Sequence, residues 1–159
     1  MTIKHETPAD TRRERIVAAI IEREWGVTLQ RCEGEYASTD YWIMRNGGSI
    51  GVMELKCRAN PSTKYATIFF ATTKYKELMK IATQHSILPL FVAAFTDGVV
   101  YGINARHTDD MGVGIVRRTK PRLSGEIGIN DTEPAICVPI NAMKLMGKMS
   151  ASELLKYAP

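Results

Sequence analysis

Residues 39–57 read TDYWIMRNGGSIGVMELKC, and this stretch decides how the chain is expected to fold. At its centre, Asn46-Gly47-Gly48 predicts a tight hairpin turn, because asparagine and glycine accept the positive φ angles that such a turn requires. The segments on either side, 39–44 and 49–57, are predicted to be strands. The hairpin would place these two strands side by side and antiparallel.

The second predicted strand ends in two charged residues. Its side chains alternate between two faces, one with Ile50, Val52, Glu54 and Lys56 and the other with Gly51, Met53, Leu55 and Cys57. Both faces begin apolar, so we expect the strand in the middle of a sheet that is covered on both sides. Burying the charges of Glu54 and Lys56 costs several kcal/mol unless they pair or bind a metal. The alternative is a strand end that emerges into solvent.

Asp40 begins the partner strand, so the hairpin is expected to bring its side chain toward Glu54. Two carboxylates and the ammonium group of Lys56 would then converge. Hard divalent cations such as Mg²⁺ prefer oxygen ligands and commonly use one or two carboxylates with waters and a substrate phosphate. The alternative for Asp40 is a role as a turn-capping residue.

The rest of the chain alternates predicted helices and strands. We expect a helix from Asp10 or Thr11 to Trp25, strands at 27–32, 39–44, 49–57, 88–95 and 99–103, an extended segment at 67–71, and a helix from Thr72 or Thr73 to His85. A long connection over 104–130, an edge strand at 135–140 and short helical turns over 141–156 would follow. The pattern predicts one α/β domain spanning residues 1–159.

Charge composition favours a polyanionic partner. The net charge is +4 and the isoelectric point is near 9.0. Basic residues gather in the predicted long connection, and those expected to contact phosphates are Arg106, Arg117, Arg118, Lys120 and Arg122. A solvated loop is the alternative for this segment.

Several other classes of protein find no support in the sequence. The longest apolar stretch, 87–94, is too short to span a bilayer, and residues 1–11 lack a signal-peptide core, so we expect a cytoplasmic protein without a membrane partner. The cysteines and histidines show neither C-x-x-C nor H-E-x-x-H spacing. No phosphate-binding glycine motif is present, which predicts that no nucleotide cofactor is used.

The predicted order of elements resembles the PD-(D/E)XK nuclease superfamily, whose core is a helix, a three-stranded meander, a second helix and another strand. Ser38-Thr39-Asp40 stands where the family has its P-D, without the proline, and Glu54-Leu55-Lys56 stands as its E-x-K. The layout is most similar to archaeal Holliday-junction resolvases and small phage nucleases. The resemblance implies a restriction-endonuclease-like α/β fold, a mixed central sheet flanked by helices.

The resemblance also implies roles for further residues. The resolvases carry a glutamate at the start of the first helix, where Glu14 stands, and Glu24 is a rival on the same helical stripe. Lys74 stands where the family often has a glutamine or lysine, and it could contact the scissile phosphate; an exposed helix lysine is the alternative. The implied metal ligands are Asp40, Glu54, Glu14 and the backbone carbonyl of Leu55, with Lys56 orienting the attacking water or neutralising the phosphate.

A nuclease of this family would be an Mg²⁺-dependent endodeoxyribonuclease, with Mn²⁺ as a substitute, acting in the cytoplasm or, if phage-encoded, in that of the host. The resemblance suggests DNA as the substrate, junctions or flaps as the preferred structures, and a homodimer as the active form. RNA and duplex ends stay open as substrates, and so does a monomer, which would fit a nicking or exonuclease role better. The alternative is an adaptor that keeps the fold and binds nucleic acid without cutting it.

Overall fold

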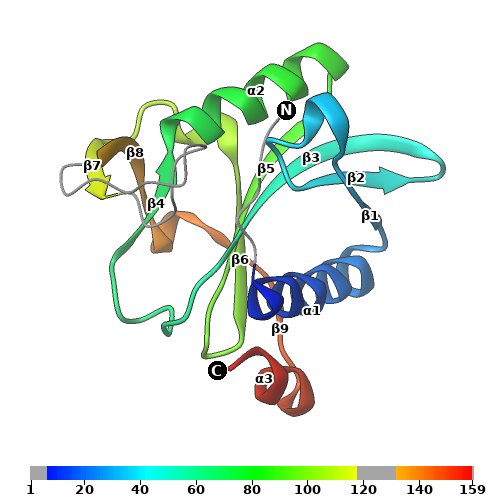
Figure 1. Cartoon of the computed structure of the whole chain (residues 1–159), viewed down its shortest axis with the longest axis vertical. Helices are drawn as coiled ribbons and strands as arrows, with labels where there is room; N and C mark the ends of the chain where they lie inside the picture. The colour runs from blue at the N-terminus through cyan, green and yellow to red at the C-terminus, as the bar shows by residue number, and fades with distance from the viewer. Residues whose placement is uncertain (1–6, 118–131, 159) are drawn as a thin grey trace.

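The computed structural model describes residues 7–117 and 132–158, and its main feature is a six-stranded mixed sheet (Figure 1). The strands lie in the order β1 (Thr28–Arg31), β2 (Tyr41–Arg45), β3 (Gly48–Cys57), β5 (Leu88–Ala94), β6 (Val99–Asn104) and β9 (Lys144–Lys148). β3 and β5 are parallel, and every other neighbouring pair in this sheet is antiparallel. The predicted three-stranded meander is therefore present as β1, β2 and β3.

The hairpin between β2 and β3 is formed by the predicted turn. Asn46 and Gly47 have φ angles of 51° and 80°, in the left-handed region that glycine, and after it asparagine, adopts at least cost. β3 lies between β2 and β5, and Val52 and Met53 on its two faces are both fully buried. The expectation of a central strand covered on both sides is confirmed.

Helix α1 (Pro8–Trp25) covers one face of the sheet. It begins earlier than predicted because Thr7 is its N-cap and forms a capping box with Asp10. Val17, Ile20 and Ile21 pack against a cluster of sheet residues that includes Met53, Leu55, Val92 and Val100. Trp25, the last residue of the helix, is 49% exposed, and its indole N–H donates to the carbonyl of Met146 at 2.9 Å.

Helix α2 (Thr72–His85) covers the opposite face and forms the crossover between the parallel strands β3 and β5. Its inner residues Leu78, Ile81 and Ala82 pack with Val52 and Phe91. The helix begins at Thr72, one of the two predicted starts, but neither threonine caps it: the N-cap is Ala71, and no side chain caps the helix there. The helix follows β4 without a break, so the preceding strand sets where it starts.

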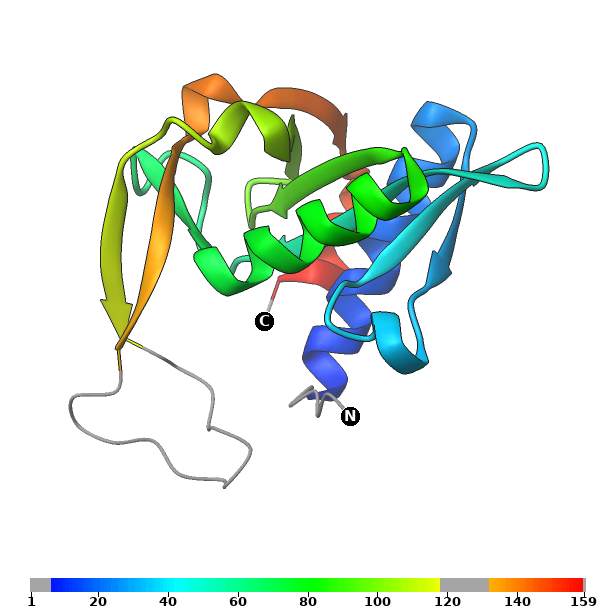
Figure 2. The same cartoon turned by 90° about the horizontal axis from the view of Figure 1, so that it is seen from above.

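A second sheet lies beside α2, on the side away from the β2–β3 hairpin (Figure 2). Its strands are in the order β4 (Thr67–Ala71), β8 (Thr132–Pro139) and β7 (Val113–Arg117). β8 was predicted as an edge strand, but it is central. Its prolines fit because Pro134 lies beyond the segment paired with β4 and Pro139 beyond the segment paired with β7, so each has only one neighbouring strand.

Two strands after Asn104 differ from the prediction. β7 lies within the predicted long connection. Its Val113 and Ile115 are 62% and 76% exposed, so the strand lacks the usual alternation of buried apolar and exposed polar residues. β9 replaces part of the predicted helical turns and pairs with β6. The chain then forms helix α3 (Ala151–Tyr157), which packs against α1. Within the described residues, no helix is both long and apolar enough to cross a membrane.

The stacked pair Phe70 and Phe91 gives a test of the core. Their ring centroids lie 4.2 Å apart and both side chains are fully buried. We expect Phe91→Ala to lower the free energy of unfolding by about 3–5 kcal/mol, because it removes a large apolar group and leaves a cavity. Leu155→Ala, at a position 82% exposed, is expected to change it by less than about 0.5 kcal/mol. Urea unfolding of both variants measures the difference, and equal losses would contradict the packing described.

Candidate active site

Asp40 directly precedes β2 and lies close to the end of β3. Its N–H donates to the Met53 carbonyl at 3.1 Å although Met53 already pairs with Tyr41, so Asp40 is an extra residue at the start of the β2–β3 pair. Its side chain reaches β3 at Leu55, the residue that follows Glu54. The hairpin therefore brings the Asp40 carboxylate beside the Glu54–Leu55 segment.

The carboxylate of Asp40 is fixed against the main chain of β3. Its Oδ2 accepts a hydrogen bond from the Leu55 N–H at 2.8 Å, and its carbonyl accepts one from the Cys32 N–H at 2.9 Å. Asp40 is 8% exposed and Glu54 is 3% exposed. A carboxylate buried to this degree needs strong polar partners, and an amide donor to a charged oxygen is one of them. Asp40 is therefore held by the strand that carries Glu54 and Lys56.

Lys56 places a positive charge beside Glu54. The two side chains follow each other on one face of β3, and Lys56 Nζ lies 3.9 Å from Glu54 Oε1. The Lys56 side chain is 34% exposed, against 4% for that of Glu54. The strand end therefore presents an ammonium group that solvent or substrate can reach, next to a carboxylate that is almost enclosed.

Lys74 lies near the site rather than pointing into solvent. Its Nζ donates to the Ser38 carbonyl at 2.8 Å, two residues before Asp40. The Ser38 hydroxyl also donates to Glu77 on α2 at 3.3 Å. The first turns of α2 are thus tied to the segment that leads into Asp40.

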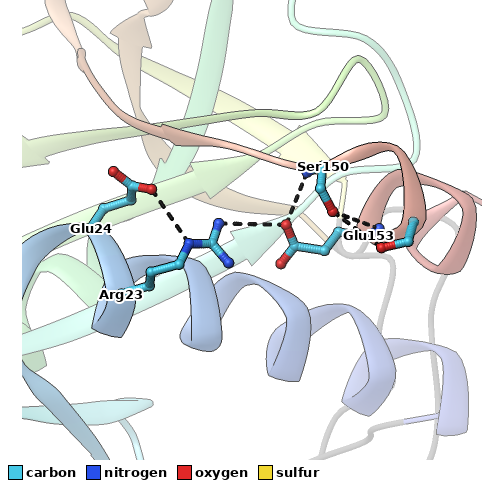
Figure 3. Close-up of polar contacts among 5 residues, drawn as sticks. Arg23, Glu24, Ser150 and Glu153 are labelled. Carbon is cyan, nitrogen blue, oxygen red and sulfur yellow. Dashed lines mark hydrogen bonds and ion pairs between the residues drawn. The ribbon is translucent and has the colours of Figure 1, made fainter.

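Glu14 is buried on the inner side of α1, as expected, and binds Arg31 of β1 at 2.9 Å. α1 packs on the face of the sheet opposite α2, and the charges of Glu14 and Asp40 both act on the thiol of Cys57, which follows Lys56 at the end of β3. The rival Glu24 lies near the other end of the helix, 49% exposed, where it pairs with Arg23 at 3.4 Å (Figure 3). Of the two glutamates, only Glu14 faces the sheet.

Negative charge accumulates in this desolvated region. Burial raises the pKa of the Cys57 thiol to about 12, and the charges of Glu14 and Asp40 add to the effect. Burial also raises the pKa of Tyr41 to about 12, with the charge of Glu14 next in importance. Both groups stay protonated near neutral pH, so they add no further negative charge. A site of this kind attracts cations.

The donor atoms at the strand end are oxygens. They are the carboxylates of Asp40 and Glu54 and, on the residue between Glu54 and Lys56, the carbonyl of Leu55. Within the described residues, no three side chains of histidine, cysteine, aspartate or glutamate gather into a ready metal cage. Two carboxylates with main-chain oxygen, water and substrate phosphate are the ligands that Mg²⁺ commonly uses. The residues present therefore fit a hard divalent cation.

Comparisons with known proteins agree with this geometry. A family model described as phage putative PDDEXK endonuclease matches residues 2–146. The chain belongs to this endonuclease family. Its fold is similar to that of Hjc, a Holliday junction resolvase from the archaeal hyperthermophile Archaeoglobus fulgidus, with a TM-score of 0.56 and 13% identity over 88% of this chain and 97% of the resolvase. No curated protein sequence matches the chain. The predicted family and the restriction-endonuclease-like fold are both confirmed.

Of the predicted phosphate contacts of this PDDEXK endonuclease, Arg106 lies away from the E-x-K motif. Arg106 donates to the Ile87 carbonyl at 3.3 Å, beside Leu88 at the start of β5. Leu88 pairs with Gly51, which precedes Glu54 by three residues on β3. Because a strand rises by about 3.3 Å per residue, Gly51 and Glu54 are about 10 Å apart along it. Arg117 ends β7, where its main chain pairs with Thr132. Arg118, Lys120 and Arg122 lie outside the described residues.

The sequence analysis missed the residues that hold the motif in place. Arg31 binds Glu14, which lies 17 positions away in the sequence. Ser38 binds Glu77, which lies 39 positions away. A buried glutamate predicted on the inner face of α1 implies a cationic partner, which was a usable signal for Arg31. No local pattern marks Ser38 or Glu77.

Two substitutions at Asp40 test the geometry by stability alone. In Asp40→Asn, the amide oxygen can still accept the Leu55 N–H and the buried carboxylate charge is gone, so we expect a melting temperature at or above that of the wild type. Asp40→Ala leaves that buried N–H without its acceptor and is expected to cost about 1–3 kcal/mol. Thermal unfolding measures both, and equal melting temperatures would show that the bond does not hold the strand end.

Proposed function

We propose that this protein is a divalent-metal-dependent endonuclease that hydrolyses phosphodiester bonds in DNA. The observation that carries the proposal is the buried Asp40–Glu54 pair beside Lys56, in a chain of an endonuclease family. Burying two carboxylates side by side destabilises a fold unless a cation offsets their charge. A protein that only bound nucleic acid would gain nothing from this arrangement, so the adaptor alternative explains less.

In the proposed reaction, Asp40, Glu54 and the carbonyl of Leu55 would hold one or two Mg²⁺ ions, with Mn²⁺ as a substitute. A bound divalent ion supplies Lewis acidity, lowering the pKa of a water and offsetting charge on the phosphate. Asp40 stays in place because its Oδ2 is bonded to the Leu55 N–H. Lys56 orients the attacking water or neutralises a phosphate oxygen, since its ammonium group lies on the accessible side of Glu54.

Two further residues have conditional roles. Glu14 contacts Arg31 through Oε2 at 2.9 Å, and a carboxylate that keeps this contact would still be able to serve as a metal ligand. Lys74 reaches the scissile phosphate only if it leaves the Ser38 carbonyl, which a more strongly accepting phosphate oxygen can induce. We assign both to the active site in these roles.

The proposed substrate is DNA, and branched forms such as junctions and flaps are the first to test. The net charge of +4 supports a polyanionic substrate, and the likeness in fold to a resolvase supports branched DNA and a homodimer that cuts two strands. The phage family supports action in the cytoplasm of a host cell.

A cleavage panel tests the activity. We expect wild-type protein to cut labelled branched or duplex DNA with Mg²⁺ or Mn²⁺, and EDTA to stop it. Glu54→Gln should lower the rate by about 10²-fold or more while DNA binding persists, because it removes a charged ligand without a change of volume. Glu24→Gln, an exposed glutamate already paired with Arg23, is the matched control and should keep wild-type activity. Binding without cleavage on DNA and RNA, with either metal, would overturn the proposal.

Salt dependence tests the basic segment. Replacing Arg117, Arg118, Lys120 and Arg122 together with serine should weaken DNA binding and reduce the slope of log K against log salt by about one unit per lost phosphate contact. Arg106→Ala should change the slope less, since Arg106 is bonded to the Ile87 carbonyl at the far end of β5. Fluorescence anisotropy over a range of KCl concentrations measures both slopes. An unchanged slope in the fourfold variant would exclude this segment from the interface.

A further inference from the structure

We infer that helix α3 is part of the active-site framework and that Tyr157 is a positioning residue, which fixes the strand end that carries Glu54 and Lys56. The inference rests on the proposed nuclease function. It concerns an element outside the family match, because that match ends at residue 146 and α3 begins at Ala151.

The hydroxyl of Tyr157 lies where the two parallel strands end. It donates to the Arg58 carbonyl at 2.8 Å and is 3.1 Å from the Ala94 carbonyl. Ala94 is the last residue of β5, and the Arg58 N–H donates to the same Ala94 carbonyl at 2.9 Å, one rung beyond the end of β3. One side chain therefore joins both strand ends, two residues after Lys56.

The ring of Tyr157 supports β3 from the face opposite the site. It is fully buried in the cluster that contains Met53, Leu55 and Val92, whereas Glu54 and Lys56 project from the other face of β3. Leu55 is also the residue whose N–H holds Asp40. A shift of this strand end would therefore move Glu54, the Leu55 carbonyl and Asp40 together. Displacements of about 1 Å in such groups are enough to reduce a rate strongly.

The same tyrosine connects the strand end to α1. The Arg13 guanidinium lies 5.2 Å from the centre of the Tyr157 ring, and its Nε donates to the Tyr157 carbonyl at 2.9 Å. The neighbouring Arg12 Nε donates to the Lys156 carbonyl at 2.8 Å. Both arginines thus bind carbonyls at the C-terminal end of α3, where positive charge is favoured. Glu14 directly follows Arg13, so this contact also fixes the turn of α1 that carries Glu14.

The other end of α3 provides a matched control (Figure 3). There Ser150 and Glu153 form a capping box, and Glu153 binds Arg23 at 3.5 Å. Glutamine at position 153 can keep the capping box while the charge is lost. Glu153→Gln therefore removes only an exposed ion pair between α3 and α1 and leaves the contacts of the Tyr157 hydroxyl in place.

The test compares wild type, Tyr157→Phe and Glu153→Gln for kcat, for KM on DNA, and for the Mg²⁺ concentration that gives half the maximal rate, well below the melting temperature of each. We expect Tyr157→Phe to lower kcat at least about tenfold and to raise the Mg²⁺ requirement, because the ligands lose their alignment. Its KM for DNA should stay near that of the wild type. Glu153→Gln should match the wild type in all three quantities.

Arg13→Gln is the second variant if Tyr157→Phe does not fold. It keeps the hydroxyl but removes the contacts of Arg13 with the Tyr157 ring and carbonyl, and it should change kcat and the Mg²⁺ requirement in the same direction by a smaller factor. Wild-type kinetics in a folded Tyr157→Phe variant would overturn the inference and leave the proposed function standing. If Tyr157→Phe does not fold, wild-type kinetics in Arg13→Gln would have the same meaning. A loss of kcat in Glu153→Gln as large as that in Tyr157→Phe would also overturn the inference. Wild-type protein that cuts no substrate would overturn both.

Discussion

Two carboxylates held side by side in the interior are the constraint on which this structure depends. Asp40 and Glu54 are both buried where β2 begins and β3 ends, and the desolvation of their carboxylates opposes folding. The Leu55 N–H and the Lys56 ammonium group offset part of that cost. A divalent cation would offset much more of it, so the proposed function gives a reason for a strand end that burial alone disfavours.

The rest of the fold holds this strand end from both sides. On one face, α2 reaches the segment before Asp40 through the contact of Lys74 with the Ser38 carbonyl. On the other face, α1 supplies Glu14, held by Arg31. The apolar clusters under the two helices, one around Phe91 and the other around Met53, make these contacts rigid. A charged pair at the end of a central strand is therefore surrounded by elements from distant parts of the chain.

Predictions from sequence succeeded where residues adjacent in the sequence determine the local structure. They failed where a segment becomes a strand because it pairs with a strand that is distant in the sequence. The turn at Asn46 and Gly47 and the alternation along β3 follow from local backbone and side-chain preferences. β7 and β9 carry weak patterns of their own and exist because β8 and β6 offer them hydrogen bonds. The exposure of Trp25 has the same origin, since its indole N–H binds a carbonyl of a strand more than a hundred residues away.

The sequence by itself determined the turn at Asn46 and Gly47, and hence the antiparallel approach of β2 to β3, because these two strands are joined by only a few residues. It did not determine their register, which shifts between Ile43 and Met44. Composition and motif also determined the family to which the chain belongs. Only the tertiary structure decided that Glu14 rather than Glu24 faces the sheet and that Arg106 lies far from the motif. It alone showed Tyr157 closing the ends of β3 and β5. These contacts join segments up to 144 residues apart, and their geometry depends on how helices pack on the sheet, which no local preference encodes.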